Sequence, residues 1–99
     1  LKLTETLPIG KYGRMRKHFL QENRPFLFNE LVLSESLFPH LLETEAAAHQ
    51  RIENLLPALM RKAGVTEDLK RRDQIAWVGA LNNIRDRVNE IVLNEVIFV

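Results

Sequence analysis

The chain of 99 residues contains no cysteine, which excludes disulfides, thiolate nucleophiles and zinc sites built on cysteine. The absence agrees with a reducing compartment, and we expect a cytoplasmic protein. No apolar run approaches the roughly 18 to 20 residues that span a bilayer, and the first residues show no secretory signal pattern. The chain also lacks alternating β-branched runs and Asn-Gly or Asp-Gly hairpin turns. These absences predict an all-α fold without a membrane partner.

Composition and length predict one folded unit. Hydrophobic residues make up 45% of the chain and charged residues 27%, as in ordinary globular proteins. A chain of this size can close one core but not two. We therefore expect a single helical domain over residues 10–99. Residues 1–9 lack a helical pattern and contain Pro8, and we expect them to form an extended lead-in.

The first two helices are predicted from periodicity. Between residues 11 and 23, large apolar side chains recur on one helical face and basic ones on the other. Asn23 can cap a second helix, from Pro25 to about Leu33, because proline is tolerated in a first turn. This short helix is rich in large apolar residues, which predicts burial on more than one side.

A third helix is predicted to begin at a cap formed by Ser34 or Ser36 and to end at Gly64, a residue suited to a left-handed C-terminal cap. Pro57 falls inside its pattern. Because an interior proline removes one hydrogen bond and costs about 3 kcal/mol, we expect a kink or a break near residues 53–56. The pattern leaves open whether Pro57 bends one helix or separates two.

The last third of the chain predicts a long C-terminal helix. Thr66 can cap a short segment with acids in its first turn, and we expect a break near Asp73 before the long helix begins. Four or five helices with short connections predict a compact bundle in which the C-terminal helix is the spine. Its core-facing stripe is expected to contain Trp77, Leu81, Ile84, Val88, Ile91 and Val92.

Three polar residues, Asn82, Arg85 and Asn89, lie along one flank of this stripe at helical spacing. They can be structural, tying neighbouring helices and fixing their register, or they can form a contact surface for a partner or a phosphate. Glu95 lies on the apolar stripe itself, so either the helix frays there or this carboxylate is paired.

Two basic stretches, residues 10–24 and 61–72, flank an acidic one at residues 30–53. Clustered Lys and Arg side chains can neutralise DNA phosphates, although a solvated surface is the alternative, since the sequence pI is about 8.4. The second helix is too apolar to be an exposed recognition helix. The candidate phosphate contacts are Lys11, Arg14, Lys17, Arg71 and Arg72.

Catalytic and metal-binding patterns are scarce. His40 and His49 are nine residues apart and project in opposing directions on a helix, unlike an i, i+4 metal pair. Glu43 and Glu45 with His49 are better explained as a solvated acidic face. The chain has no Gly-rich phosphate loop and no G-x-S-x-G elbow. We therefore expect no enzyme, with no catalytic residue, cofactor or metal.

Three segments resemble the TnpV-type proteins of bacterial transposons and integrative elements. They are GKYGRMRKHFLQENRPFLFNEL at residues 10–31, GVTEDLK at 64–70 and DQIAWVGALNNIRDRVNEIVLNEVI at 73–97. The string W-V-G-x-x-N-N-I-R at residues 77–85 is the most specific part. Family members usually carry an aromatic and Gly-rich lead-in, which is missing or shortened here.

The resemblance implies a small cytoplasmic protein of a mobile element. Some members of the family have been likened to excisionases. The leading hypothesis is an accessory protein that contributes to excision by contacting DNA or the element-encoded recombinase. The alternative is a protein-interaction module or homo-oligomer without DNA contact. Its partner, or a second copy in a homodimer, would dock on the second helix or on the flank of Asn82, Arg85 and Asn89.

Overall fold

The computed structural model describes residues 9–99. The predicted lead-in at residues 1–9 therefore lies, apart from Ile9, outside the described residues. The described part is all-α, as expected from the sequence, and contains no strand. Its elements are α2 (Lys11–Asn23), α3 (Pro25–Leu33), α4 (Leu37–Ala63), α5 (Glu67–Arg72), α6 (Gln74–Val92) and a π-helical turn, η1 (Leu93–Ile97).

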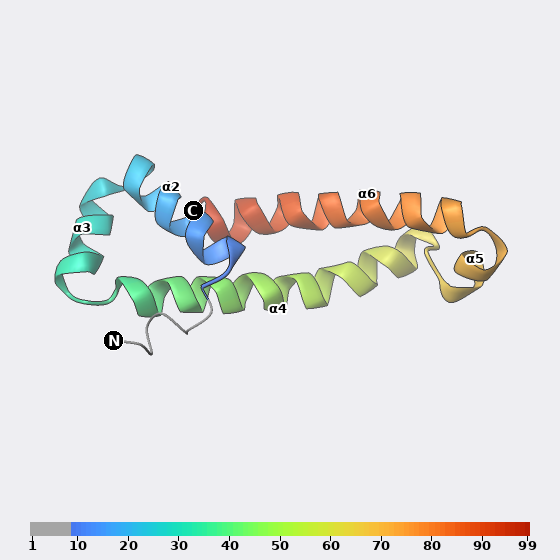
Figure 1. Cartoon of the computed structure of the whole chain (residues 1–99), viewed down its shortest axis with the longest axis horizontal. Coiled ribbons are helices and arrows are strands. Elements are labelled where there is room, and N and C mark those ends of the chain that lie inside the picture. The colour runs from blue at the N-terminus through green and yellow to red at the C-terminus, as the bar shows by residue number, and fades with distance from the viewer. Residues whose placement is uncertain (1–8) are drawn as a thin grey trace.

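The molecule is a long helix pair with additional helices at each end. In Figure 1, α4 and α6 run side by side in opposite directions, α5 joins them at one end, and α2, α3 and the C-terminus gather at the other. The extents are 55 × 29 × 18 Å, and a helix is about 10 Å across, so the molecule is about two helices thick. We call residues 54–86 the arm, and residues 9–53 and 87–99 the body.

The core lies almost entirely in the body. The predicted stripe on α6 is confirmed there by Val88 and Val92, whereas Trp77 and Leu81, in the arm, are only half-buried. The reason is that α2 covers the pair α4/α6 in the body, and no helix does so along the arm (Figure 1). The buried hydrophobic residues are Tyr12, Leu20, Leu41, Ala48, Val65, Val88, Val92 and Ile97.

Helix α4 continues through Pro57 as a single helix of 27 residues, so Pro57 does not separate two helices. Packing of the neighbouring Leu55, Leu56 and Leu59 against the core offsets the lost hydrogen bond. Gly64 ends the helix with φ 75° and ψ 22°, the predicted left-handed cap. Ser36 occupies the N-cap position, but its side chain makes no capping hydrogen bond.

The predicted helix boundary at Asp73 is confirmed. The amide of Leu69 donates to Thr66 Oγ1 at 3.2 Å, and the amide of Ala76 donates to Asp73 Oδ1 at 3.1 Å. Each helix therefore begins with its own side-chain cap. The predicted cap at Asn23 is wrong: this residue belongs to α2, where its side-chain amide donates to the carbonyl of Phe19, and Arg24 stands at the N-cap of α3.

At the end of α6 the chain widens into the π-helical turn instead of fraying. Glu95 lies in this turn and is paired, since its Oε1 accepts a hydrogen bond from Arg51 Nε of α4 at 2.8 Å. The pairing alternative for Glu95 is therefore the one that the structure supports.

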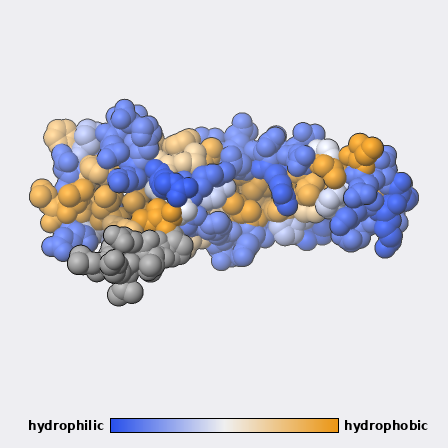
Figure 2. Space-filling view, in the orientation of Figure 1, coloured by the Kyte–Doolittle hydropathy of each residue, from blue (hydrophilic) through white to orange (hydrophobic). Residues whose placement is uncertain are grey.

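The predicted burial of α3 is wrong, because none of its residues is buried. Phe26 is 89% exposed and Leu33 is 83% exposed. The helix lies at the outer end of the body, where only its inner side meets other helices (Figure 1). Figure 2 shows the resulting hydrophobic surface at this end, with further apolar patches between α4 and α6. None of the described helices is both long and apolar enough to cross a membrane.

Candidate functional site

Helix α2 is fixed to α4 by the buried carboxylate of Glu45. Its Oε1 accepts a hydrogen bond from the backbone amide of Gly13 at 2.7 Å, and its Oε2 lies 2.5 Å from His49 Nε2. A methyl group at Gly10 would lie 2.8 Å from Glu45 Oε2, so only glycine permits this approach. The predicted solvated acidic face of Glu43, Glu45 and His49 is therefore wrong for Glu45, which is only 8% exposed and joins two helices.

Arg16 is a second anchor and is also buried. Its Nη1 donates to the backbone oxygens of Ile97 and Val99 at 2.7 and 2.8 Å, and its Nε donates to His40 Nε2 at 3.2 Å. Burial and, secondarily, the nearby Arg24 lower the pKa of Arg16. Burial and then the Arg16 charge lower the pKa of His40. Arg16 therefore ties α2 to the C-terminal turn and is only 6% exposed.

The five candidate phosphate contacts do not form one surface. Lys11, Arg14 and Lys17 are exposed on α2, whereas Arg71 and Arg72 lie on α5, at the opposite end of the molecule (Figure 1). Both arginines of α5 also pair with Asp68, at 3.5 and 2.9 Å. These surface pairs reduce the local positive charge without adding much stability.

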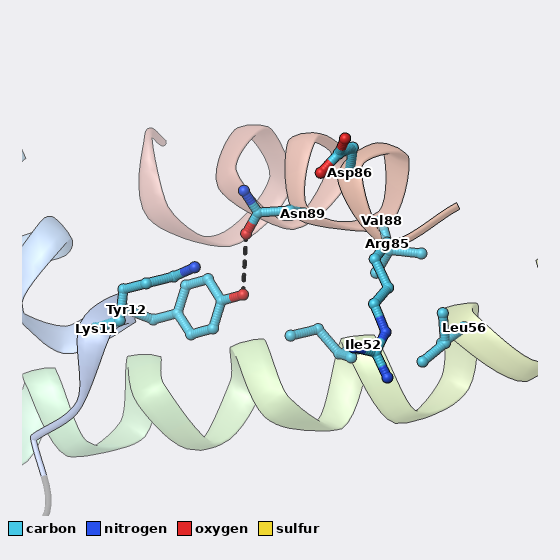
Figure 3. Close-up of a pocket in the computed structure, with 8 residues that line it drawn as sticks. All are labelled: Lys11, Tyr12, Ile52, Leu56, Arg85, Asp86, Val88 and Asn89. Carbon is cyan, nitrogen blue, oxygen red and sulfur yellow. Dashed lines mark hydrogen bonds between the residues drawn. The ribbon is translucent and has the colours of Figure 1, made fainter. Parts of the chain in front are cut away.

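The polar flank of α6 divides into two parts. Asn89 is half-buried, and its Oδ1 accepts a hydrogen bond from the Tyr12 hydroxyl at 3.0 Å (Figure 3). Burial and then the Glu45 charge raise the pKa of Tyr12, which keeps this donor protonated. Asn82 and Arg85 are exposed, and no hydrogen bond joins the three flank residues within residues 9–99. Asn89 is thus structural, whereas Asn82 and Arg85 remain open to a partner.

Arg85 and Asn89 line a hollow of about 420 Å³ between α4, α6 and α2. Figure 3 shows Arg85 reaching from α6 across to Ile52 and Leu56 of α4, while Asp86 turns away from them. Lys11 lies at the α2 side of the same hollow. The complete lining is Lys11, Tyr12, Ile52, Leu56, Arg85, Asp86, Val88 and Asn89.

A second hollow, of about 320 Å³, continues along the arm. It shares Leu56 with the first and includes Met60, Trp77 and, at the α5 end, Glu67. The two hollows lie along the same helix pair and both border Leu56, and together we call them the α4/α6 groove. Lys70 Nζ lies 4.8 Å from the centre of the Trp77 ring, adding a cation at this end.

The sequence reasoning did not identify Gly10, Arg16 and Glu45 as interacting residues. Their contacts join segments 24 to 83 positions apart, and local periodicity contains no signal for such pairs. One signal was present: a charged residue on an otherwise apolar helix face is expected to be paired when buried. Within residues 9–99, no three metal-ligating side chains lie close enough to share a metal ion.

Comparison with known proteins identifies a family. A family model described as "Transposon-encoded protein TnpV" matches residues 1–97. Neither a curated protein nor a solved structure matches the chain.

Proposed function

Because this chain belongs to the TnpV family of transposon-encoded proteins, we propose that it is an accessory protein of its element that acts by binding another protein, first of all the element's recombinase. The proposed role is binding and involves no catalysis. The observation that carries it is the exposure of the apolar helix α3. The separation of the basic residues of α2 and α5 favours this role over one continuous DNA-binding face.

The side chains of α3 have the arrangement of a docking helix. Phe26 and Leu33 are seven residues apart, which is about two turns, so they lie on the same face. Their exposures of 89% and 83% are unusual for large apolar side chains, and their spacing is that of helices that insert into a groove of a partner. Burying the two side chains in a partner would remove this apolar area from water.

A binding titration between the purified protein and the recombinase of the same element tests the proposal. We expect the double variant F26E/L33E to weaken binding at least 100-fold, because two carboxylates would enter an apolar contact. The double variant A47E/A58E adds the same charge at exposed positions of α4 and should bind as the wild type does. Equal binding by all three proteins, or no binding by the wild type, would contradict the proposal.

A second candidate, excisionase-like DNA contact, is favoured by the exposure of Lys11, Arg14 and Lys17 on α2. Three phosphate contacts predict a slope of roughly −3 for log affinity against log salt. Gel shifts with element-end DNA should then lose most of their affinity in K11A/R14A/K17A. R71A/R72A should lower the DNA affinity less, because these side chains already pair with Asp68. A flat salt dependence, or no shift at low salt, would exclude this candidate.

A further inference from the structure

The polar flank of α6 is part of a longer seam. Ile75 and Val78 precede Asn82, Arg85 and Asn89 at alternating spacings of three and four residues, the spacing of a coiled-coil contact stripe. Ile75 is 87% exposed and Val78 is 43% exposed, so none of the helices within residues 9–99 covers the apolar start of this seam. The seam is distinct from the core stripe of α6, which packs on α4.

Arg85 and Asn89 of the seam line the α4/α6 groove, and the whole seam has a length that suits a helix. From Ile75 to Asn89 the α6 backbone rises by about 21 Å, at 1.5 Å per residue. Ile52, Leu56 and Met60 of α4 supply the apolar opposite wall. Tyr12, whose hydroxyl is bonded to Asn89, lines the groove at one end, and Glu67 of α5 lines it at the other. A helix of about four turns therefore fits along it.

The charges of the groove favour an acidic occupant. Its lining contains the cations Lys11, Arg61 and Arg85 and the acids Glu67 and Asp86. Asp86 turns away in Figure 3, and Arg85 extends across the groove. Within residues 9–99, neither Lys11 nor Arg85 has a carboxylate within 4.0 Å.

Lys70 adds a further cation beside Trp77. A second copy of this groove would bring like charges together, whereas an acidic helix would neutralise them. The apolar wall formed by Ile52, Leu56 and Met60 disfavours a nucleic acid as the occupant.

We propose that the α4/α6 groove binds an acidic amphipathic helix of a partner protein. The apolar face of that helix packs on Leu56, Met60 and Val78, and its carboxylates pair with Arg85 and Lys11. This surface is separate from α3, so it adds a second protein contact to the one proposed above and does not depend on it.

The only tryptophan of the chain lines this groove, so its fluorescence reports occupancy directly. The probes are two synthetic helices of about 14 residues, which is about four turns. Both have the same leucine seam, and the remaining faces contain glutamates in one and lysines in the other. We expect the glutamate peptide to shift the Trp77 emission saturably and to bind at least 10-fold more tightly than the lysine peptide. A scrambled glutamate peptide, which has no apolar face, should give no shift.

Charge reversal on α6 tests whether peptide binding depends on Arg85 itself or on the overall surface charge. R85E should weaken binding of the glutamate peptide at least 10-fold and should strengthen binding of the lysine peptide. R87E is the matched control: Arg87 is exposed on the same helix but is turned about 200° away from Arg85 and lines a different hollow with Leu59. It should bind as the wild type does. F26E/L33E should also bind the peptide normally, which distinguishes this site from α3 docking.

Three outcomes would overturn the proposal. Equal affinity for the two peptides would mean that the groove binds the apolar face of a helix regardless of its charge. Equal losses of affinity in R85E and R87E would mean that peptide binding depends only on the net charge of the protein. A mass that rises with protein concentration, together with a Trp77 shift in the absence of peptide, would mean that a second copy fills the groove. Circular dichroism of each variant confirms that the helices are intact.

Discussion

The body and the arm are built from the same two long helices, but they bury their side chains differently. In the body, α2 adds a third helix, and Leu20, Ala48, Val92 and Ile97 are completely buried. The buried polar residues are also found there, each with a hydrogen-bond partner. In the arm, Val65 is the only buried hydrophobic residue among those described. The body thus has a closed core, with α3 as its exposed apolar part, whereas the arm has no third helix over its core and leaves apolar surface between α4 and α6.

The largest expected effect tests this comparison directly. Leu20 is 0% exposed, so Leu20→Ala should lower the free energy of unfolding by about 2 to 5 kcal/mol, because the core cannot fill the cavity. Leu81→Ala, in the half-buried stripe of the arm, should cost less than half as much. Urea denaturation followed by circular dichroism measures both. Equal losses would mean that the arm is as well packed as the body.

A second, smaller effect comes from the contact between α2 and α4. Gly10→Ala places a methyl group 2.8 Å from Glu45 Oε2, and Glu45 cannot withdraw without breaking its bonds to Gly13 and His49. We expect a loss of about 1 to 3 kcal/mol. The same denaturation experiment measures it. A neutral result would show that Glu45 does not hold the two helices in this position.

The sequence predicted some features of this fold and could not predict others. Thr66 and Gly64 act within one turn of the chain, so their capping roles follow from local chemistry and were predicted; at Asp73 the helix boundary was predicted, but not the side-chain cap. The burial of α3 was predicted wrongly, since its composition reports hydrophobicity but not which helices surround it. Likewise the sequence grouped Asn82, Arg85 and Asn89 correctly on one flank, but only tertiary structure distinguishes the bonded Asn89 from the exposed pair.

Glycine in the arm should behave in the opposite way from Gly10. Gly79 lies inside α6, and a methyl group there would meet nothing within 4 Å. Gly79→Ala should therefore raise the free energy of unfolding by about 0.5 to 1 kcal/mol, because alanine loses less backbone entropy in a helix. Thermal denaturation detects this as a higher Tm. A destabilised variant would indicate that the arm surface at Gly79 is more closely packed than it is in the structure.

The smallest effect is expected from pH, because it depends on one half-buried side chain of the body. His40 accepts a hydrogen bond from Arg16 only in its neutral form, and its pKa is lowered below 6.5 by burial and by the Arg16 charge. The unfolded chain therefore takes up the proton first as the pH falls. The free energy of unfolding should decrease from the ordinary pKa down to the lowered one and then level off. His40→Gln keeps an acceptor for Arg16 but cannot titrate, so denaturation series between pH 5 and 8, compared for the two proteins, should differ in this slope. Identical pH profiles would remove His40 from the anchor that joins α2 to the C-terminal turn.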